Sequence, residues 1–327
     1  MIKLNTLQYN PLNQVNIPNS YALSALTPNS DFEALCQSYK DTFGYKKLKT
    51  FSFSKEGFLG LLLELKGNIC ICEGESEALI QGAKMYEKLG FKVSWLKLTQ
   101  DGKVNLYTLQ DNNIDFLFAS SYVMDTFVQT DITKIKQRTQ AKIISNASAH
   151  KDAQSDAIYF DNYKLTGFNT SSVLLFNDES FELLPIGTID TIALKLCKEA
   201  LDAQRWNHTI KNVFLEKLRE VFEENIYFFV EPEITLDYSL HFGLKNIKAR
   251  ELIRTLALNK IFITNGEGCS LGLSKPSRII QAMGYDEDAS RNAIELSFRD
   301  DITLDKIDFV IDKMFSKYKQ LISFNGL

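Results

Sequence analysis

The sequence predicts an α/β protein in which a large domain is built on an open, mostly parallel β-sheet and a smaller α+β domain follows it. Through the first half of the chain, short apolar segments alternate with segments of helical length, an order typical of parallel sheets. Residues 114–119 and 173–176 are continuous apolar runs, as expected of strands that are covered on both faces. After residue 205 the alternation of strand-like and helical segments is lost, which indicates a second domain.

The elements of the large domain are predicted in order along the chain. Residues 1–30 are rich in Asn, Pro and Ser and are expected to be irregular, and a helix over 31–43 follows, capped by Ser30 or Asp31. An apolar helix ends at Leu65, and Gly90 ends another helix over 76–89. Strands are expected at residues 48–52, 68–72, 91–98, 114–119, 142–146, 156–160 and 172–176.

The back third mixes both kinds of element. Helical patterns cover residues 189–222, 247–257, 277–283 and 305–321, and strands are expected at 227–230, 235–242 and 261–263. We therefore expect an N-terminal arm over residues 1–20, a large α/β domain over 21–205 and a small α+β domain over 206–327.

Composition narrows the class of protein. The chain has 327 residues, enough for two domains, and a net charge of −4, which argues against a general nucleic-acid-binding protein. The N-terminus lacks the apolar run of a signal peptide, and no segment reaches the ~20 apolar residues of a membrane span. Five cysteines at irregular spacing indicate free thiols, so we expect a cytoplasmic protein without a membrane anchor. The three histidines show no metal-ligand spacing, and no metal site is expected.

Residues 258–284 contain the most informative pattern. An apolar strand leads into a loop with Gly266 and Gly268, Cys269 comes next, and Pro276 opens a short helix that Gly284 ends. A reactive cysteine needs access and polar surroundings, whereas a structural cysteine packs as a small hydrophobic residue. The position of Cys269 alone leaves both interpretations open.

The wording of this stretch resembles the active-site loop of the cysteine desulfurases, which are pyridoxal 5'-phosphate (PLP) enzymes of fold type I and the class V aminotransferase group. The matching residues are Gly266, Gly268, Cys269, Pro276, Ser277, Ala282 and Gly284. The resemblance implies a PLP-dependent transferase fold, with Cys269 taking sulfur from L-cysteine as a persulfide while alanine is released. It also implies a possible sulfur-acceptor protein as a partner.

Two lysines compete for the role of the residue that holds PLP as a Schiff base. Lys151 completes the family's Ser-x-His-Lys motif but is followed by a polar loop. Lys164 matches that motif poorly, but a strand beginning with Asp precedes it, and Gly167 and then an apolar strand follow it. These surroundings favour Lys164.

Other sequence motifs of the family can be matched in the same order along the chain. Ser54 and Lys55 stand where backbone N–H groups at a helix start bind the cofactor phosphate. Thr188, in Gly187-Thr188, matches a threonine that reaches the phosphate across a dimer interface, which implies a homodimer.

Several departures fall on positions that carry chemistry. The family's stacking histidine falls at Ser76, the aspartate that pairs with the ring nitrogen falls at Asn146, and the histidine before the lysine is Tyr163. The arginine that clamps the substrate carboxylate falls at Glu295, which reverses the charge. The sequence therefore leaves open a divergent aminotransferase or lyase, or a catalytically degenerate paralogue that acts as a dimeric scaffold or binding protein.

Overall fold

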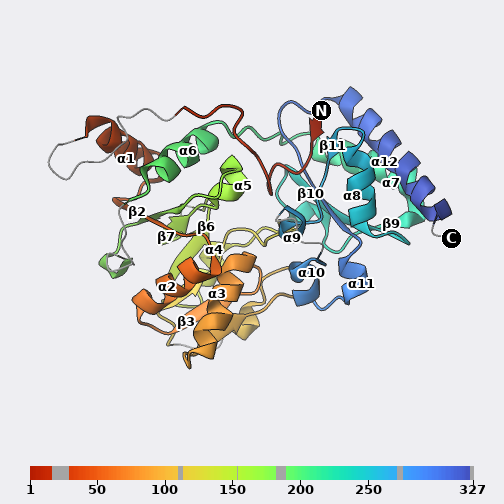
Figure 1. Ribbon diagram of the computed structural model, residues 1–327. Helices are drawn as coiled ribbons and strands as arrows, with labels where there is room; N and C mark the ends of the chain where they lie inside the picture. The colour runs from red at the N-terminus through yellow and green to blue at the C-terminus, as the bar shows by residue number, and fades with distance from the viewer. Residues whose placement is uncertain (17–28, 110–112, 153, 182–188, 271–274, 325–327) are drawn as a thin grey trace.

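The computed structural model describes residues 1–16, 29–109, 113–152, 154–181, 189–270 and 275–324, with only the backbone of Cys269 and Ser270. The chain forms two lobes, each with its own β-sheet (Figure 1). The larger lobe holds a seven-stranded sheet, and the smaller lobe holds a three-stranded antiparallel sheet.

The seven-stranded sheet is mostly parallel, as predicted. Only β8 (Ser172–Phe176) runs antiparallel to its neighbours, β7 (Ala157–Tyr159) and β2 (Lys47–Phe51). The remaining strands are β6 (Lys142–Asn146), β5 (Phe116–Phe118), β3 (Ile69–Cys72) and β4 (Val93–Leu96), in the sheet order β2-β8-β7-β6-β5-β3-β4. Every residue of β3, β5, β7 and β8 is buried, which explains why these strands read as continuous apolar runs.

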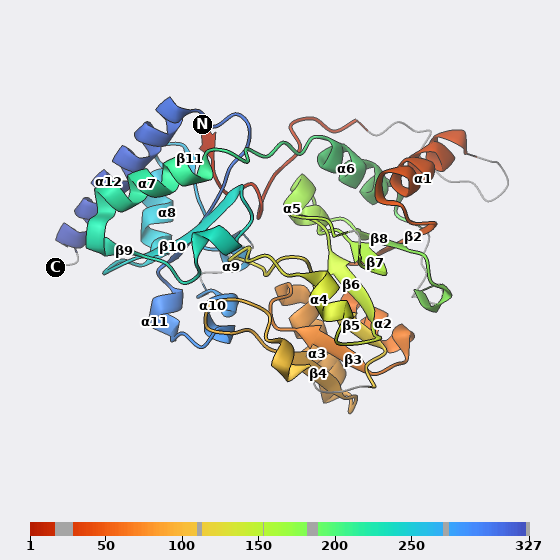
Figure 2. The same cartoon turned by 180° about the vertical axis from the view of Figure 1, so that it is seen from behind.

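Helices cover both faces of this sheet (Figure 2). On one face α2 (Lys55–Leu65) and α3 (Glu77–Lys88) pack against side chains that include Tyr159 and Phe176. On the other face α1 (Ser30–Phe43) and α6 (Thr191–Asp202) pack against the alternate residues of the same strands, such as Ile158 and Leu175. This two-sided burial fixes the sheet as the rigid platform from which the loops project.

The smaller lobe is α+β, as predicted. Its sheet has the order β12 (Ala293–Ser297), β10 (Ser239–Leu244) and β9 (Ile226–Tyr227), and it packs against α7 (Lys211–Phe222), α8 (Ala249–Ala257) and α12 (Leu304–Phe324). Two short helices, α10 (Arg278–Ala282) and α11 (Glu287–Ser290), lie in the connection from β11 to β12. No helix in the described ranges is long and apolar enough to cross a membrane.

The N-terminal residues differ from the irregular arm that composition indicated. Strand β1 (Ile2–Lys3) pairs in parallel with β11 (Ile261–Phe262) of the smaller lobe, and Leu4 is fully buried in that lobe's core. The segment is ordered because its few apolar side chains are buried, although its high content of Asn and Pro is typical of an irregular segment. The chain then crosses to α1 in the larger lobe (Figure 1).

Two further local predictions were wrong. The expected continuous helix over 189–222 is two helices, α6 and α7, separated by residues 203–210. The expected glycine loop that carries Cys269 is shorter, because Glu267–Ser270 form the single-turn helix α9 between the two lobes (Figure 1).

Candidate functional site

Buried polar residues follow four neighbouring parallel strands at the carboxyl edge of the large sheet. Glu75 comes after β3, Asp125 after β5, Asn146 ends β6, and Lys164 follows β7. Ligands of open α/β sheets bind at this edge, because the loops that follow the strands converge there. The fold therefore brings together residues that are far apart in the sequence.

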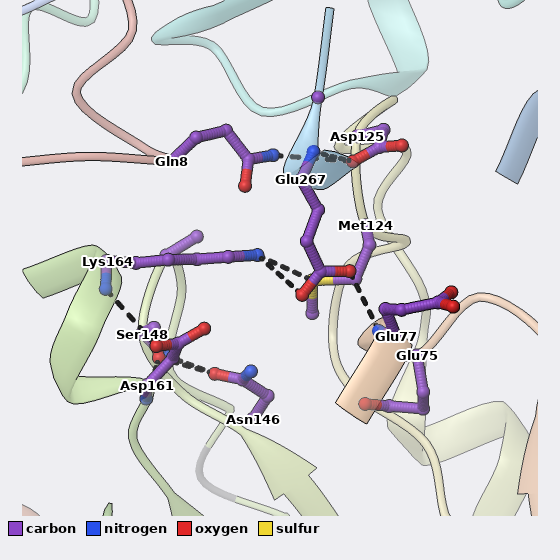
Figure 3. Close-up of polar contacts among 12 residues, drawn as sticks. Gln8, Glu75, Glu77, Met124, Asp125, Asn146, Ser148, Asp161, Lys164 and Glu267 are labelled. Atoms are coloured by element: carbon purple, nitrogen blue, oxygen red, sulfur yellow. Dashed lines mark hydrogen bonds and ion pairs between the residues drawn. The ribbon is translucent and has the colours of Figure 1, made fainter. Parts of the chain in front are cut away.

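Lys164 lies on α5 (Asn162–Thr166), a short helix that the sequence did not predict. Asp161 caps this helix by accepting a hydrogen bond from the backbone N–H of Lys164 at 3.2 Å. The lysine is 6% exposed, and its Nζ lies 3.5 Å from Glu267 Oε1 and 3.7 Å from Met124 Sδ (Figure 3). The side chain is thus held inside the protein with a carboxylate at its tip.

A cavity of about 460 Å³ adjoins Lys164, within the range of small-molecule sites. Its lining includes the start of α2, the start of α3, and α9. The lining residues are Phe53, Lys55, Glu77, Ala78, Gln81, Asp161, Tyr163, Lys164, Asn169 and Glu267.

Carboxylates dominate the charge around Lys164. Burial lowers the pKa of Lys164, but the carboxylates of Glu267, Asp161, Asp125 and Glu295 together outweigh burial and raise it. Lys164 is therefore protonated near neutral pH. Burial raises the pKa of Asp161 to about 6, with Lys164 acting in the opposite direction.

Glu267 ties α9 to both sides of the cavity. Its backbone N–H donates to Asp125 Oδ1 at 2.8 Å, and its Oε2 accepts from the backbone N–H of Glu77, the first residue of α3, at 2.8 Å (Figure 3). With the 3.5 Å contact to Lys164, this one residue joins α9 to three other segments, to two of them through its side chain and to Asp125 through its backbone. The backbone of Cys269 lies two residues further along the same helical turn.

Glu295 and Gln8 form a second buried contact that involves an acidic side chain, and neither residue lines the cavity. Glu295, on β12, is fully buried, and its Oε2 accepts from Gln8 Nε2 at 2.7 Å. The same Gln8 nitrogen lies 3.5 Å from Asp125 Oδ1. Burial raises the pKa of Glu295 well above its ordinary value, and Asp125 adds to that effect.

The structure places the remaining predicted site residues in different surroundings. Ser54 caps α2 and accepts from Gly57 N at 3.1 Å, Lys55 and Tyr163 line the cavity, and Ser76 is buried at the start of α3. Asn146 is buried at the end of β6. Thr188 lies outside the described residues.

Lys151, the alternative lysine, lies away from the cavity. It is exposed, and its Nζ donates to the backbone carbonyl of Phe43 at 3.3 Å and lies 5.1 Å from the centre of that ring.

Sequence reasoning missed most of the acidic residues at the site. Asp125, Asp161 and Glu75 lie in segments that follow buried strands and carry no distinctive spacing, and Gln8 lies in the segment expected to be irregular. One available signal was the position of Asp161, because an Asp three residues before Lys164 is a helix-cap pattern. No group of His, Cys, Asp and Glu within the described ranges is arranged to hold a metal ion.

The chain has distant relatives of known kind. Cysteine desulfurase IscS of Pasteurella multocida is 21% identical over 280 residues, covering 75% of this chain and 68% of that protein. Cysteine desulfurase IscS of Photobacterium profundum is 20% identical over 290 residues, covering 78% and 70%. The chain resembles the cysteine desulfurases. No family model matches it.

Solved structures of NifS-like proteins share the fold. A NifS-like protein superimposes with a TM-score of 0.78 at 14% identity, covering 98% of this chain and 99% of the other. A NifS-like protein from Rickettsia africae gives a TM-score of 0.72 at 15% identity, with the same coverage. At these identities the similarity establishes fold type I, as predicted.

PLP, the cofactor of cysteine desulfurases, fits the residues of this site at three places, two on the lining of the cavity and one, Asn146, outside that lining at the end of β6. Lys164 offers an amine at the cavity wall, and the N-terminus of α2 offers backbone N–H groups beside Lys55 for a phosphate. The Nδ2 atom of Asn146 is a buried donor without a partner among the described residues. The stacking position departs, because Ser76 has no ring, although Phe53 lines the same cavity.

Proposed function

We propose that the chain is a PLP-dependent enzyme that moves sulfur from L-cysteine to Cys269, and that Lys164 is the residue that holds the cofactor. The observation that supports this most is the contact between Glu267 and Lys164. It brings the helical turn that carries Cys269 against the buried lysine at the carboxyl edge of a fold type I sheet.

The proposed reaction balances without an added oxidant or reductant. The bond between the substrate β-carbon and its sulfur breaks, and a bond forms between that sulfur and Cys269 Sγ. The proton that the Cys269 thiol gives up is balanced by the hydrogen that the β-carbon gains, so the products are alanine and the persulfide. When bound, PLP supplies an electron-accepting ring that weakens bonds at the substrate α-carbon.

The protein's own groups supply positions and protons. Lys164 Nζ must lose a proton to act as a nucleophile, and Glu267 Oε1 at 3.5 Å is the acceptor best placed to receive it. The N-terminus of α2, with Lys55, would hold the phosphate. The thiolate of Cys269 is the form that attacks sulfur.

The decisive experiment follows sulfur and alanine together. Purified protein with PLP and L-cysteine should release alanine and carry a persulfide that mass spectrometry locates on Cys269. Cys269→Ala should stop both, whereas Cys36→Ala, which changes a half-buried free cysteine on α1, should leave both intact. PLP binding without alanine release would instead indicate an aminotransferase or another lyase.

The lysine assignment has its own test. Lys164→Ala should abolish the visible absorbance of the PLP-loaded protein and the label left after borohydride reduction, because no other amine of the described residues lines the cavity except exposed Lys55. Lys151→Ala should leave both signals unchanged. The reverse result would assign the cofactor to Lys151.

A second candidate function is a scaffold or binding protein that retains the fold without catalysis. The specific observation in its favour is Glu295, which is buried with Asp125 where the resemblance calls for a cation to clamp the substrate carboxylate. A buried carboxyl group with a raised pKa offers no positive charge to bind the substrate carboxylate there. Protein that binds no PLP at micromolar concentration would favour the scaffold.

The proposal extends to assembly and location. The match at Thr188 supports a homodimer in which each chain completes its partner's phosphate site, and a cytoplasmic sulfur-acceptor protein would take the persulfide sulfur. Neither a nucleic acid nor a membrane is part of the proposed function.

A further inference from the structure

The side-chain amide of Asn146 has an orientation that its neighbours determine. The backbone N–H of Ser148 lies 2.9 Å from one amide atom, and a backbone N–H can only donate, so that atom is the carbonyl oxygen Oδ1. The hydroxyl of Tyr122 at 3.1 Å and Ser148 Oγ at 2.6 Å donate to the same oxygen. The other amide atom is therefore the nitrogen, Nδ2.

The donation from Ser148 Oγ is supported by a further contact. The backbone N–H of Asp161 donates to one lone pair of Ser148 Oγ at 2.7 Å, and the hydroxyl proton of Ser148 is free to point to Asn146. Three donors thus converge on Oδ1 from two loops, and turning the amide over would set its N–H groups against the backbone N–H of Ser148, which cannot accept.

The Nδ2 atom is a buried donor with no acceptor among the described residues. Asn146 is 1% exposed, and Nδ2 is the end of the amide turned away from Ser148 (Figure 3). A buried polar group of this kind calls for a ligand or ordered water as its partner. It lies at the end of β6, next to the strand that leads to Lys164, at the sheet edge where the ligand is expected.

We propose that Asn146 donates a hydrogen bond from Nδ2 to the ring nitrogen of PLP and so keeps that nitrogen unprotonated. A pyridine nitrogen has one lone pair, and it can accept this bond only when it carries no proton. A protonated ring nitrogen would set its N–H against the amide N–H. This inference rests on the proposed function, since it requires that PLP binds.

The nearest carboxylates already have donors of their own. Glu75 accepts from Ser120 Oγ at 2.6 Å and from Tyr159 OH at 3.0 Å, and Asp161 caps α5. The position at which the resemblance leads one to expect an aspartate, which would retain a proton on the ring, is held by the amide of Asn146 and by neither of these carboxylates.

Nitrogen NMR of the protein loaded with PLP that carries ¹⁵N in its ring tests the protonation state directly. We expect the wild-type resonance at the position of an unprotonated pyridine. Ser148→Ala removes one donor to Oδ1 but leaves the backbone donor, so its resonance should stay there. Asn146→Asp should move the resonance to the pyridinium position.

A carbon analogue of the cofactor provides a second measurement that needs no variant. PLP in which the ring nitrogen is replaced by C–H cannot accept from Nδ2, so wild-type protein should bind it about fivefold more weakly, the worth of one neutral hydrogen bond. A pyridinium resonance in wild-type protein, or equal affinity for both compounds, would overturn the inference alone. Failure of wild-type protein to bind PLP would overturn both this inference and the proposed function.

Discussion

The contact between Lys164 and Glu267 controls when the lysine can react. Because neighbouring carboxylates outweigh burial and raise the pKa of Lys164, the amine is protonated at neutral pH and attachment of PLP should accelerate as pH rises. Glu267→Gln removes the nearest negative charge, so the pKa of Lys164 should fall and the midpoint of the rate profile should move to lower pH. Stopped-flow absorbance between pH 6 and 10, below the wild-type midpoint, should therefore show faster attachment of PLP to the variant than to the wild type at each pH.

Glu77→Gln is the matched control for this prediction. Glu77 lines the same cavity, but its carboxylate pairs with Arg278 at 2.9 Å rather than with Lys164. Its rate of PLP attachment at each pH should stay close to that of the wild type. An equal increase in both variants would mean that the overall charge of the cavity, and not the contact at 3.5 Å, sets the reactivity of Lys164.

A second buried carboxyl group links folding stability to pH. Burial raises the pKa of Glu75 from 4.5 to about 7, against the hydrogen bonds from Ser120 and Tyr159. The folded protein then binds this proton more tightly than the unfolded chain, so the contribution to stability is full below pH 4.5 and is lost as pH rises to about 7. The loss is about 3 kcal/mol at most.

Glu75→Gln should remove this part of the pH dependence. Between pH 4.5 and 7, the free energy of unfolding in urea should fall less steeply for the variant than for the wild type. The same slope in both proteins would show that Glu75 is ionised in the fold throughout that range.

At the scale of elements, the turn between β11 and α9 is constrained by one glycine. Gly266 has φ +114°, and a Cβ atom placed there would lie 2.5 Å from Asp125 Cγ. Gly266→Ala should therefore add backbone strain and a clash with the Asp125 side chain. Together these two effects should lower the free energy of unfolding by about 3 kcal/mol or more. Urea unfolding measures it.

Gly44→Ala separates the two effects. Gly44 ends α1 with φ +77°, and an added Cβ atom would meet nothing within 4 Å. Its cost should be about 1 kcal/mol, from the left-handed conformation alone. Similar losses in both variants would indicate that Asp125 moves aside readily when Gly266 is replaced.

The elements that the sequence predicted well are the long or fully buried ones. The strands at 142–146 and 172–176 have the predicted limits, because each contains a run of buried apolar residues, Ile143 and Ile144 in the first and residues 173–176 in the second. The helices α5 and α9, which carry Lys164 and Glu267, were missed because they have five and four residues, too few for a periodic pattern. The meeting of Gln8 with Glu295 is a contact between opposite ends of the chain, which no local pattern can encode.

At the scale of the whole molecule, we expect two chains to assemble. Sedimentation at micromolar concentration should give twice the 37.3 kDa mass of one chain. The reason is the proposed role of Thr188 at the partner's phosphate site, so the dimer should also bind PLP more tightly than dissociated chains do. A monomer that binds PLP with full affinity would contradict this expectation.

The pairing of β1 with β11 has a consequence for how the protein is made. Ile2 leaves the ribosome before the strands of the large sheet, and its partner Ile261 emerges only after the whole large sheet has been synthesised. The large lobe can therefore fold cotranslationally. Leu4 and Gln8 cannot make their contacts until the rest of the smaller lobe has been synthesised. Closing this long loop is among the last steps of folding, and since Gln8 then meets Glu295, a nascent chain has its platform for a ligand before it has a finished site.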